Sequence, residues 1–197
     1  MNENLGNILA DNAEVILDNL IENEVLKEIP VIGTSINIIK GIKNIRDVGY
    51  LNKLKTFMTQ LGEIDDDKRE RLISESKKDE KRRAKFGNAI FTAVEQSDSL
   101  IKVKYLAVAF EGFLNGDYNS SDFRLMCHTV SNAFTDDLID IIEEDEPNSE
   151  LKYLVPTGLA DPVYGDLLVS STRTEPNYEL SMTSMQLREA WRRYKTE

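Results

Sequence analysis

Apolar residues recur every three or four positions along most of residues 1–146, which is the spacing of helices that bury one face. The clearest apolar rows predict helices over residues 11–28, 51–61, 86–94 and 100–114. Acidic residues suit the N-terminal end of a helix dipole, so Asp65–Asp67 should open a further short helix that runs to Ser76. The pattern therefore predicts a helical bundle.

One more apolar row continues through residues 123–141 and predicts a single long helix. Its members are Phe123, Met126, Val130, Phe134, Leu138 and Ile141. Ser120 or Ser121 should cap the N-terminus of this helix. The helix should fray at Glu143–Glu146, because four acids oppose the dipole at a C-terminal end.

The Ile-rich stretch at residues 30–46 combines helical spacing with glycines and has two interpretations. In the first, it is a buried central helix that another backbone approaches closely. In the second, it is a basic amphipathic segment that inserts into an anionic membrane. The inserted residues would be Val31, Ile32, Ile36, Ile38, Ile39 and Ile42. A hinge at Asp47–Gly49 should separate this stretch from the next helix.

The helical spacing ends near Pro147–Ser149, beyond which prolines and glycines become frequent. Residues 166–171 and 178–181 have β-strand character and should pair as a hairpin. A closing helix should follow, capped by Thr183 or Ser184. This hairpin and helix resemble the wing end of winged-helix proteins, although no recognition helix precedes the hairpin.

The predicted fold class is mainly α, with about six or seven helices in a bundle and a small C-terminal β-hairpin with a closing helix. The bundle should occupy residues 1–146 and the small appendage residues 151–197. At 197 residues, the chain is long enough to bury a substantial core.

Charge is distributed unevenly in this chain of formal net charge −11. Residues 30–60 hold five bases and one acid, whereas residues 136–150 hold eight acids and no base. The predicted interaction surface consists of the five bases Lys40, Lys43, Arg46, Lys53 and Lys55. A competing acidic surface, which could mimic nucleic acid, consists of Asp136, Asp137, Asp140, Glu143, Glu144, Asp145 and Glu146. Direct binding of nucleic acid is not expected, because phosphate neutralisation needs a basic surface.

Catalytic and metal-binding chemistry is not indicated. Cys127 and His128 are the single cysteine and the single histidine, and neighbouring side chains on a helix point about 100° apart, so they do not converge on one ligand. No phosphate-binding loop and no nucleophile elbow occurs. We therefore expect no enzyme activity, no metal and no cofactor. The first 26 residues carry no base, which does not fit a signal peptide. We therefore expect the protein in the cytoplasm, or at the periphery of the inner membrane if residues 30–46 act on membranes.

Two local resemblances suggest a role. Residues 99–134 resemble the helical hairpin of TerB-like tellurite-resistance domains, but without the paired acids that bind metal in that family. The motif EIPVIGT at residues 28–34, followed by IRD at residues 45–47 and a basic helix, is similar to abortive-infection (Abi-alpha-like) bacterial proteins. That resemblance implies an anti-phage or stress role without enzymatic chemistry.

The leading hypothesis is therefore a non-catalytic interaction or regulatory protein that acts through a protein partner or as a homo-oligomer. A membrane-acting effector that inserts residues 30–46, with peripheral contact to an anionic membrane, is the first alternative. An acidic phage inhibitor that mimics nucleic acid is the second.

Overall fold

The computed structural model describes residues 45–61, 65–76, 80–164 and 176–196. Its helices are α4 (Ile45–Leu61), α5 (Asp66–Ser76), α6 (Glu80–Gln96), α7 (Leu100–Asn115), α8 (Ser120–Asn132), α9 (Thr135–Glu143), α10 (Leu151–Leu154) and α11 (Met182–Thr196), with a 3-10 turn, η1 (Val155–Thr157), after α10. Strands β1 (Ala160–Val163) and β2 (Asn177–Leu180) form a small antiparallel sheet. The prediction of a mainly α fold with a β-hairpin and a closing helix is confirmed.

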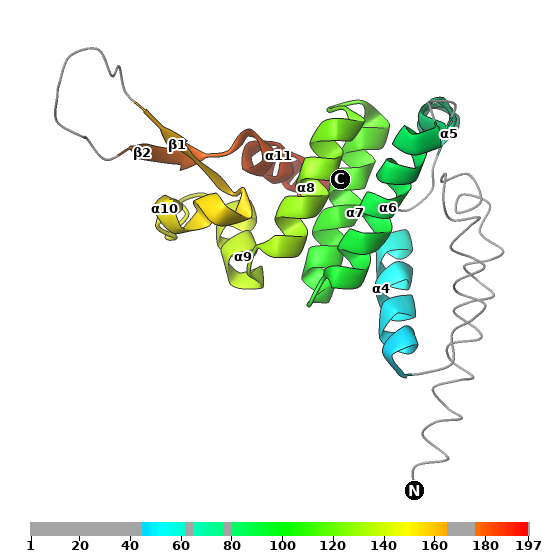
Figure 1. The fold of residues 1–197 in the computed structure, drawn as a ribbon, viewed down its shortest axis with the longest axis horizontal. Helices are drawn as coiled ribbons and strands as arrows, with labels where there is room; N and C mark the ends of the chain where they lie inside the picture. Colours follow the sequence, from blue (N-terminus) through cyan, green and yellow to red (C-terminus); the bar gives the residue numbers. More distant parts are fainter. Residues whose placement is uncertain (1–44, 62–64, 77–79, 165–175, 197) are drawn as a thin grey trace, which may run out of the picture.

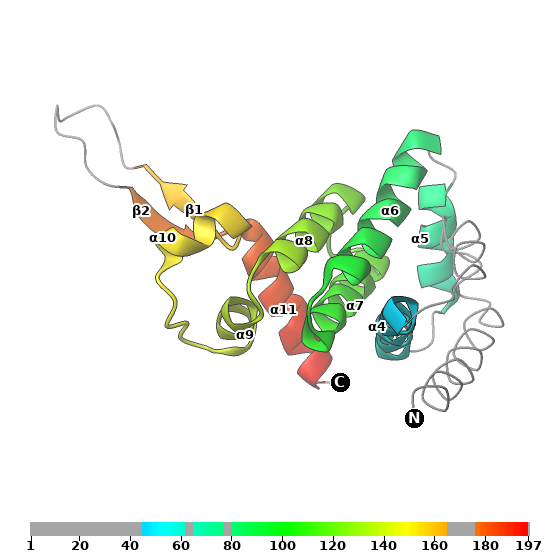
Figure 2. The same ribbon diagram turned by 60° about the horizontal axis from the view of Figure 1, so that its bottom comes forward.

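Helix α7 lies at the centre of this bundle, and α4, α6, α8 and α11 pack around it. Eleven of its 16 residues are buried, as expected for a helix that is apolar around most of its circumference. Figures 1 and 2 show α4 and α5 on one side of α6 and α7, and α8, α9 and α11 on the other side. The β-hairpin projects beyond this second side. Among the described elements, the organising helix is therefore α7.

An aromatic cluster fills the core between α4, α6, α7 and α8. Its members are Phe57, Phe86, Phe110, Phe113 and Phe123, with ring centroids 4.9 to 6.2 Å apart. Tilted ring pairs at such distances stabilise a core beyond simple area burial. Five of the seven phenylalanines thus hold the bundle together.

Helix α4 is continuous across Asp47–Gly49, so the predicted hinge there is wrong. A glycine inside a helix costs about 1 kcal/mol relative to alanine, which does not break a helix that packs against the core from Leu51 onward. Leu51, Leu54 and Phe57 are buried against the core as the apolar row predicts. The segment before Ile45, with its two competing interpretations, lies outside the described residues.

The prediction of a single helix over residues 123–141 is also wrong, because the helix is interrupted at Ala133 and Phe134. Both residues have extended backbone, with ψ angles of 153° and 148°. Asp136 and Asp137 then occupy the first turn of α9, where acids stabilise a new helix start. Helix α9 ends at Glu143, the first of the four acids that were expected to end it.

The cap of α8 is Asn119 rather than the predicted Ser120 or Ser121. Its side-chain oxygen accepts the N–H groups of Ser121 at 2.7 Å and Asp122 at 3.2 Å. The Asp122 carboxylate accepts the backbone N–H of Asn119 in return, which completes a capping box.

The β-hairpin differs from the predicted one, because the partner of β2 is β1, with Ala160 opposite Leu180. The strand expected at residues 166–171 lies outside the described residues. Ser181 ties the end of β2 to the start of β1 through its N–H, which donates to Leu159 O at 3.1 Å. Its hydroxyl accepts the N–H of Ser184, so the cap of α11 is Ser181, and the prediction of Thr183 or Ser184 is wrong.

Candidate interaction surface

Phe134 is the most exposed large apolar side chain among the described residues, at 75% exposure. It occupies the N-cap position of α9 and makes no side-chain cap. The junction beneath it is fixed: the Thr135 hydroxyl donates to Asp98 Oδ1 at 3.2 Å, and the same oxygen receives Lys102 Nζ at 3.0 Å. A rigid backbone therefore presents this ring to solvent.

Acidic side chains follow Phe134 directly. Asp136 is exposed and Asp137 is partly exposed in the first turn of α9. Burial, and then the nearby carboxylates of Asp136 and Asp140, raise the pKa of Asp137 above its usual value of 3.8. We call Phe134, Asp136 and Asp137 the α9 knob, because together they form an apolar side chain flanked by negative charge.

Three acids of the predicted acidic surface have partners on the same chain, and Asp145 among them stays exposed. The Asp140 carboxylate accepts the N–H groups of Asn148 and Ser149, at 2.8 to 3.1 Å. Glu143 accepts the Tyr105 hydroxyl and Lys195 Nζ, each at 2.7 Å. Asp145 pairs with Arg192 at 2.9 Å. The exposed remainder of that surface consists mainly of Asp136, Glu144 and Glu146.

Arg188 of α11 binds the C-terminal end of α9. Its guanidinium donates to the carbonyls of Ile141 at 2.6 Å, Glu144 at 2.9 Å and Asp145 at 3.2 Å. The last carbonyls of a helix lack partners within the helix, and a buried arginine fork can satisfy several of them. Helix α9 is thus fixed at both ends.

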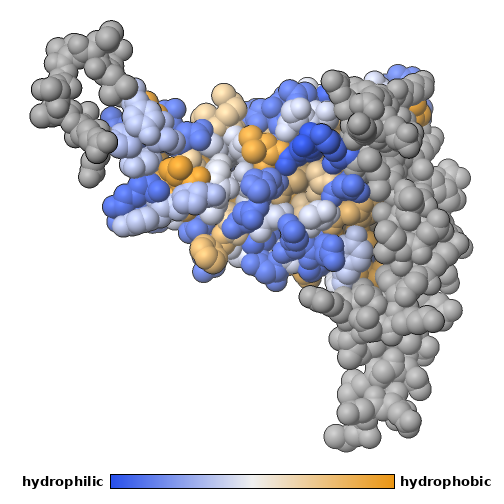
Figure 3. Space-filling view, viewed as in Figure 1, coloured by the Kyte–Doolittle hydropathy of each residue, from blue (hydrophilic) through white to orange (hydrophobic). Residues whose placement is uncertain are grey.

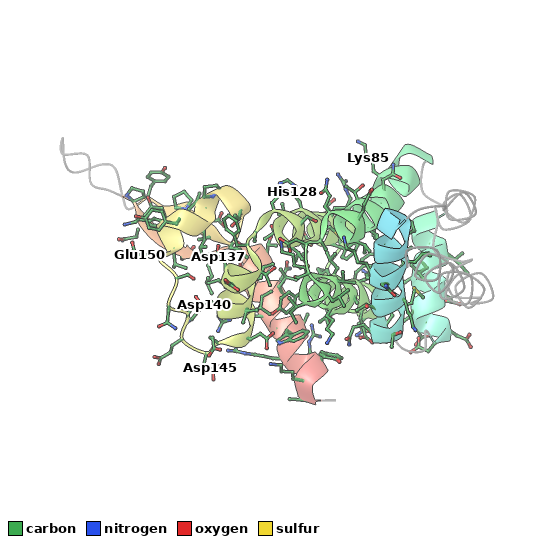
Figure 4. The ribbon with its side chains drawn as sticks, turned by 90° about the horizontal axis from the view of Figure 1, so that it is seen from below. Lys85, His128, Asp137, Asp140, Asp145 and Glu150 are labelled. Atoms are coloured by element: carbon green, nitrogen blue, oxygen red, sulfur yellow. The ribbon has the colours of Figure 1, made fainter. Side chains whose placement is uncertain are left out.

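A groove of about 720 Å³ runs between α6 and α8. Lys85 and Arg124 lie along it with His128, and none of the described residues that line it is an acid. Its apolar part includes Ala89 and the half-exposed Leu125. Figure 4 shows Lys85 and His128 along one side of the bundle. The labelled acids Asp137, Asp140, Asp145 and Glu150 lie toward the end of the molecule that carries α10.

The face seen in Figure 3 is mostly hydrophilic, with small separate apolar areas over the bundle and beside the β-hairpin. The predicted basic surface is only partly described. Lys40 and Lys43 lie outside the described residues, as does the side chain of Arg46. Lys53 donates to Glu95 O at 2.8 Å, in the last turn of α6, whereas Lys55 is exposed. Lys53 is therefore engaged in joining α4 to α6.

The residues predicted to insert into a membrane, Val31 to Ile42, lie outside the described residues. None of the helices in the described part of the chain is long and apolar enough to cross a membrane. Within that same part, no group of three or more His, Cys, Asp or Glu side chains is arranged to hold a metal ion. Cys127 is buried, which raises the pKa of its thiol, while His128 is exposed.

Two features of this region were missed from the sequence, although signals for both are present. Thr135 followed by two aspartates is typical of a helix start, and it indicates the break that exposes Phe134. Ser121, Arg124 and His128 recur at three- and four-residue spacing, which indicates a polar row beside the apolar face of α8. The apolar spacing of residues 123–141 concealed the first signal.

Comparison of the chain with models of protein families, with curated proteins and with solved structures finds no match.

Proposed function

We propose that this chain is a non-catalytic interaction protein that binds another protein molecule, either a partner or a second copy, through the surface around Phe134. The supporting observation is the 75% exposure of this ring at a helix N-cap, where Ser, Thr, Asp or Asn would be more stabilising. A small polar residue would stabilise this helix start better than the aromatic ring does, and we attribute this departure from the local preference to binding.

The proposed contact has the composition of an interface centre. Aromatic residues are enriched among the side chains that dominate binding energy, and charges at the rim steer association. Phe134 offers the aromatic anchor, and Asp136 and Asp137 offer the charges. The similarity of residues 28–47 to abortive-infection proteins favours a role in anti-phage defence or a stress response.

The described acidic residues favour this proposal over mimicry of nucleic acid. A mimic needs a regular row of free carboxylates, whereas Asp140 and Glu143 bind groups of the fold. Insertion of residues 30–46 into a membrane stays a separate hypothesis, with no supporting observation among the described helices.

Photo-crosslinking in cells tests the proposal. Benzoylphenylalanine replaces Phe134 in one variant and Tyr164, which is 65% exposed, in a matched control. We expect a protein adduct from position 134 that is absent from position 164. Equal adduct yields, or no adduct at either position, would refute an interaction function for this surface.

A further inference from the structure

The groove between α6 and α8 carries two exposed positive charges. Lys85 and Arg124 are both exposed, and neither forms an ion pair among the described residues. Although the chain has a net charge of −11, the described residues that line this groove include no acid. Such a local potential attracts an anionic surface.

The groove also has an apolar part that could receive a ring. Ala89 and Ala93 contribute small side chains from α6, and the 53% exposed Leu125 flanks them from α8. Small residues leave room for an incoming side chain, and the exposed leucine would lose contact with water when that side chain binds. The groove therefore fits an aromatic residue accompanied by carboxylates.

The α9 knob has this chemistry: one exposed aromatic ring followed closely by two carboxylates. Thr135 is bound to Asp98, and Arg188 binds the carbonyls at the end of α9, so hydrogen bonds hold both ends of this helix. A knob held in this way is available to another molecule. Both halves of a complementary contact thus occur on one chain.

We propose that the groove between α6 and α8 binds the α9 knob of a second copy of this chain. Phe134 of one copy lies against Ala89, Ala93 and Leu125 of the other, and Asp136 and Asp137 face Arg124 and Lys85. This inference deepens the proposed function, on which it rests, by naming a second copy as the partner.

A charge swap tests the pairing by sedimentation velocity. Arg124→Glu should weaken self-association about tenfold or more, and Asp136→Lys should do the same, because like charges then face each other. An equimolar mixture of the two variants should associate again, since each restores the complement that the other lacks. Lys104→Glu and Glu70→Lys make equal charge changes at exposed sites on α7 and α5, and they should associate as the wild type does.

Three results would overturn this inference: a wild-type chain that is monomeric at every concentration, control variants that lose association equally, or a mixture that stays monomeric. Because all four substitutions are at exposed positions, thermal unfolding followed by circular dichroism should confirm that each variant folds.

Peptide mapping of the adduct formed from position 134 separates this inference from the proposed function. An adduct with residues 85–96 or 121–131 of a second copy supports both. An adduct with a different protein refutes self-association and leaves the interaction function standing. Failure to form any adduct refutes both.

Discussion

Replacing Phe134 with serine separates folding from binding, and the structure gives the expected size of each effect. An aromatic side chain buries roughly 150–250 Å² when fully enclosed. At 75% exposure only about a quarter of that area is protected, which at about 25 cal/mol per Å² corresponds to roughly 1 kcal/mol. A serine at the N-cap would stabilise the fold by about 0.5–2 kcal/mol, because its hydroxyl accepts a backbone N–H group of the first turn of α9 that has no partner within the helix.

Phe134→Ser should therefore change the free energy of unfolding by less than about 1 kcal/mol in either direction. Phe123→Ala, within the fully buried aromatic cluster, should instead cost about 3–5 kcal/mol. Urea denaturation monitored by circular dichroism measures both values. A loss above about 2 kcal/mol for Phe134→Ser would show that this ring stabilises the fold, and the argument for a binding role would fail.

Three further substitutions test the packing that supports this surface. Asp98→Ala leaves the 2% exposed Lys102 without its carboxylate and should cost about 1–3 kcal/mol at neutral pH, measured by urea denaturation. The hydrogen bond from Lys102 lowers the pKa of Asp98 below 3.8 in the folded state. The wild type should therefore be more stable than Asp98→Ala above pH 3.8, and this difference in stability should disappear as the pH falls through the lower folded pKa. A difference in stability that does not depend on pH would contradict this. Gly112→Ala places a Cβ 2.5 Å from the buried Tyr118 hydroxyl and should cost about 1–3 kcal/mol, seen as a lower melting temperature; an unchanged temperature would mean that the ring moves freely. Arg188→Lys should also lower the melting temperature, because one ammonium cannot reproduce the three-carbonyl fork, and full stability would refute that role.

Much of the helical core could be predicted from the sequence, because apolar spacing reports directly which residues face inward. Leu51, Leu54 and Phe57 of α4, and Phe86 and Ile90 of α6, are buried as their spacing predicts. The same rule failed at Phe134, since the spacing of two separate helices happened to continue one apolar row across the break. Periodicity gives no information on whether the backbone between two turns is helical.

Long-range pairing explains two further errors. The partner of β2 was predicted from proximity in the sequence. In the structure, Ser181, just after β2, is hydrogen-bonded to Leu159 and Gly158, just before β1. The acidic run at residues 136–150 was predicted to be a free surface. Two of its acids pair with bases more than forty positions away in the sequence, Asp145 with Arg192 and Glu143 with Lys195.

The candidate surface was accessible from the sequence only in part. Asp136 and Asp137 were identified by charge, but without the neighbouring exposed ring that makes them part of a contact. The groove required α6 and α8 to lie side by side, because Lys85 and Arg124 are 39 positions apart in the sequence. No local pattern encodes such a juxtaposition.

The most direct test of the central claim is sedimentation velocity of the wild-type chain and of Phe134→Ser, over a range of concentrations at low and high salt. We predict that the wild-type chain associates as its concentration rises, that salt weakens this association, and that Phe134→Ser stays monomeric while folding normally. Identical sedimentation of the two proteins under all these conditions would contradict the claim that the surface around Phe134 serves self-association.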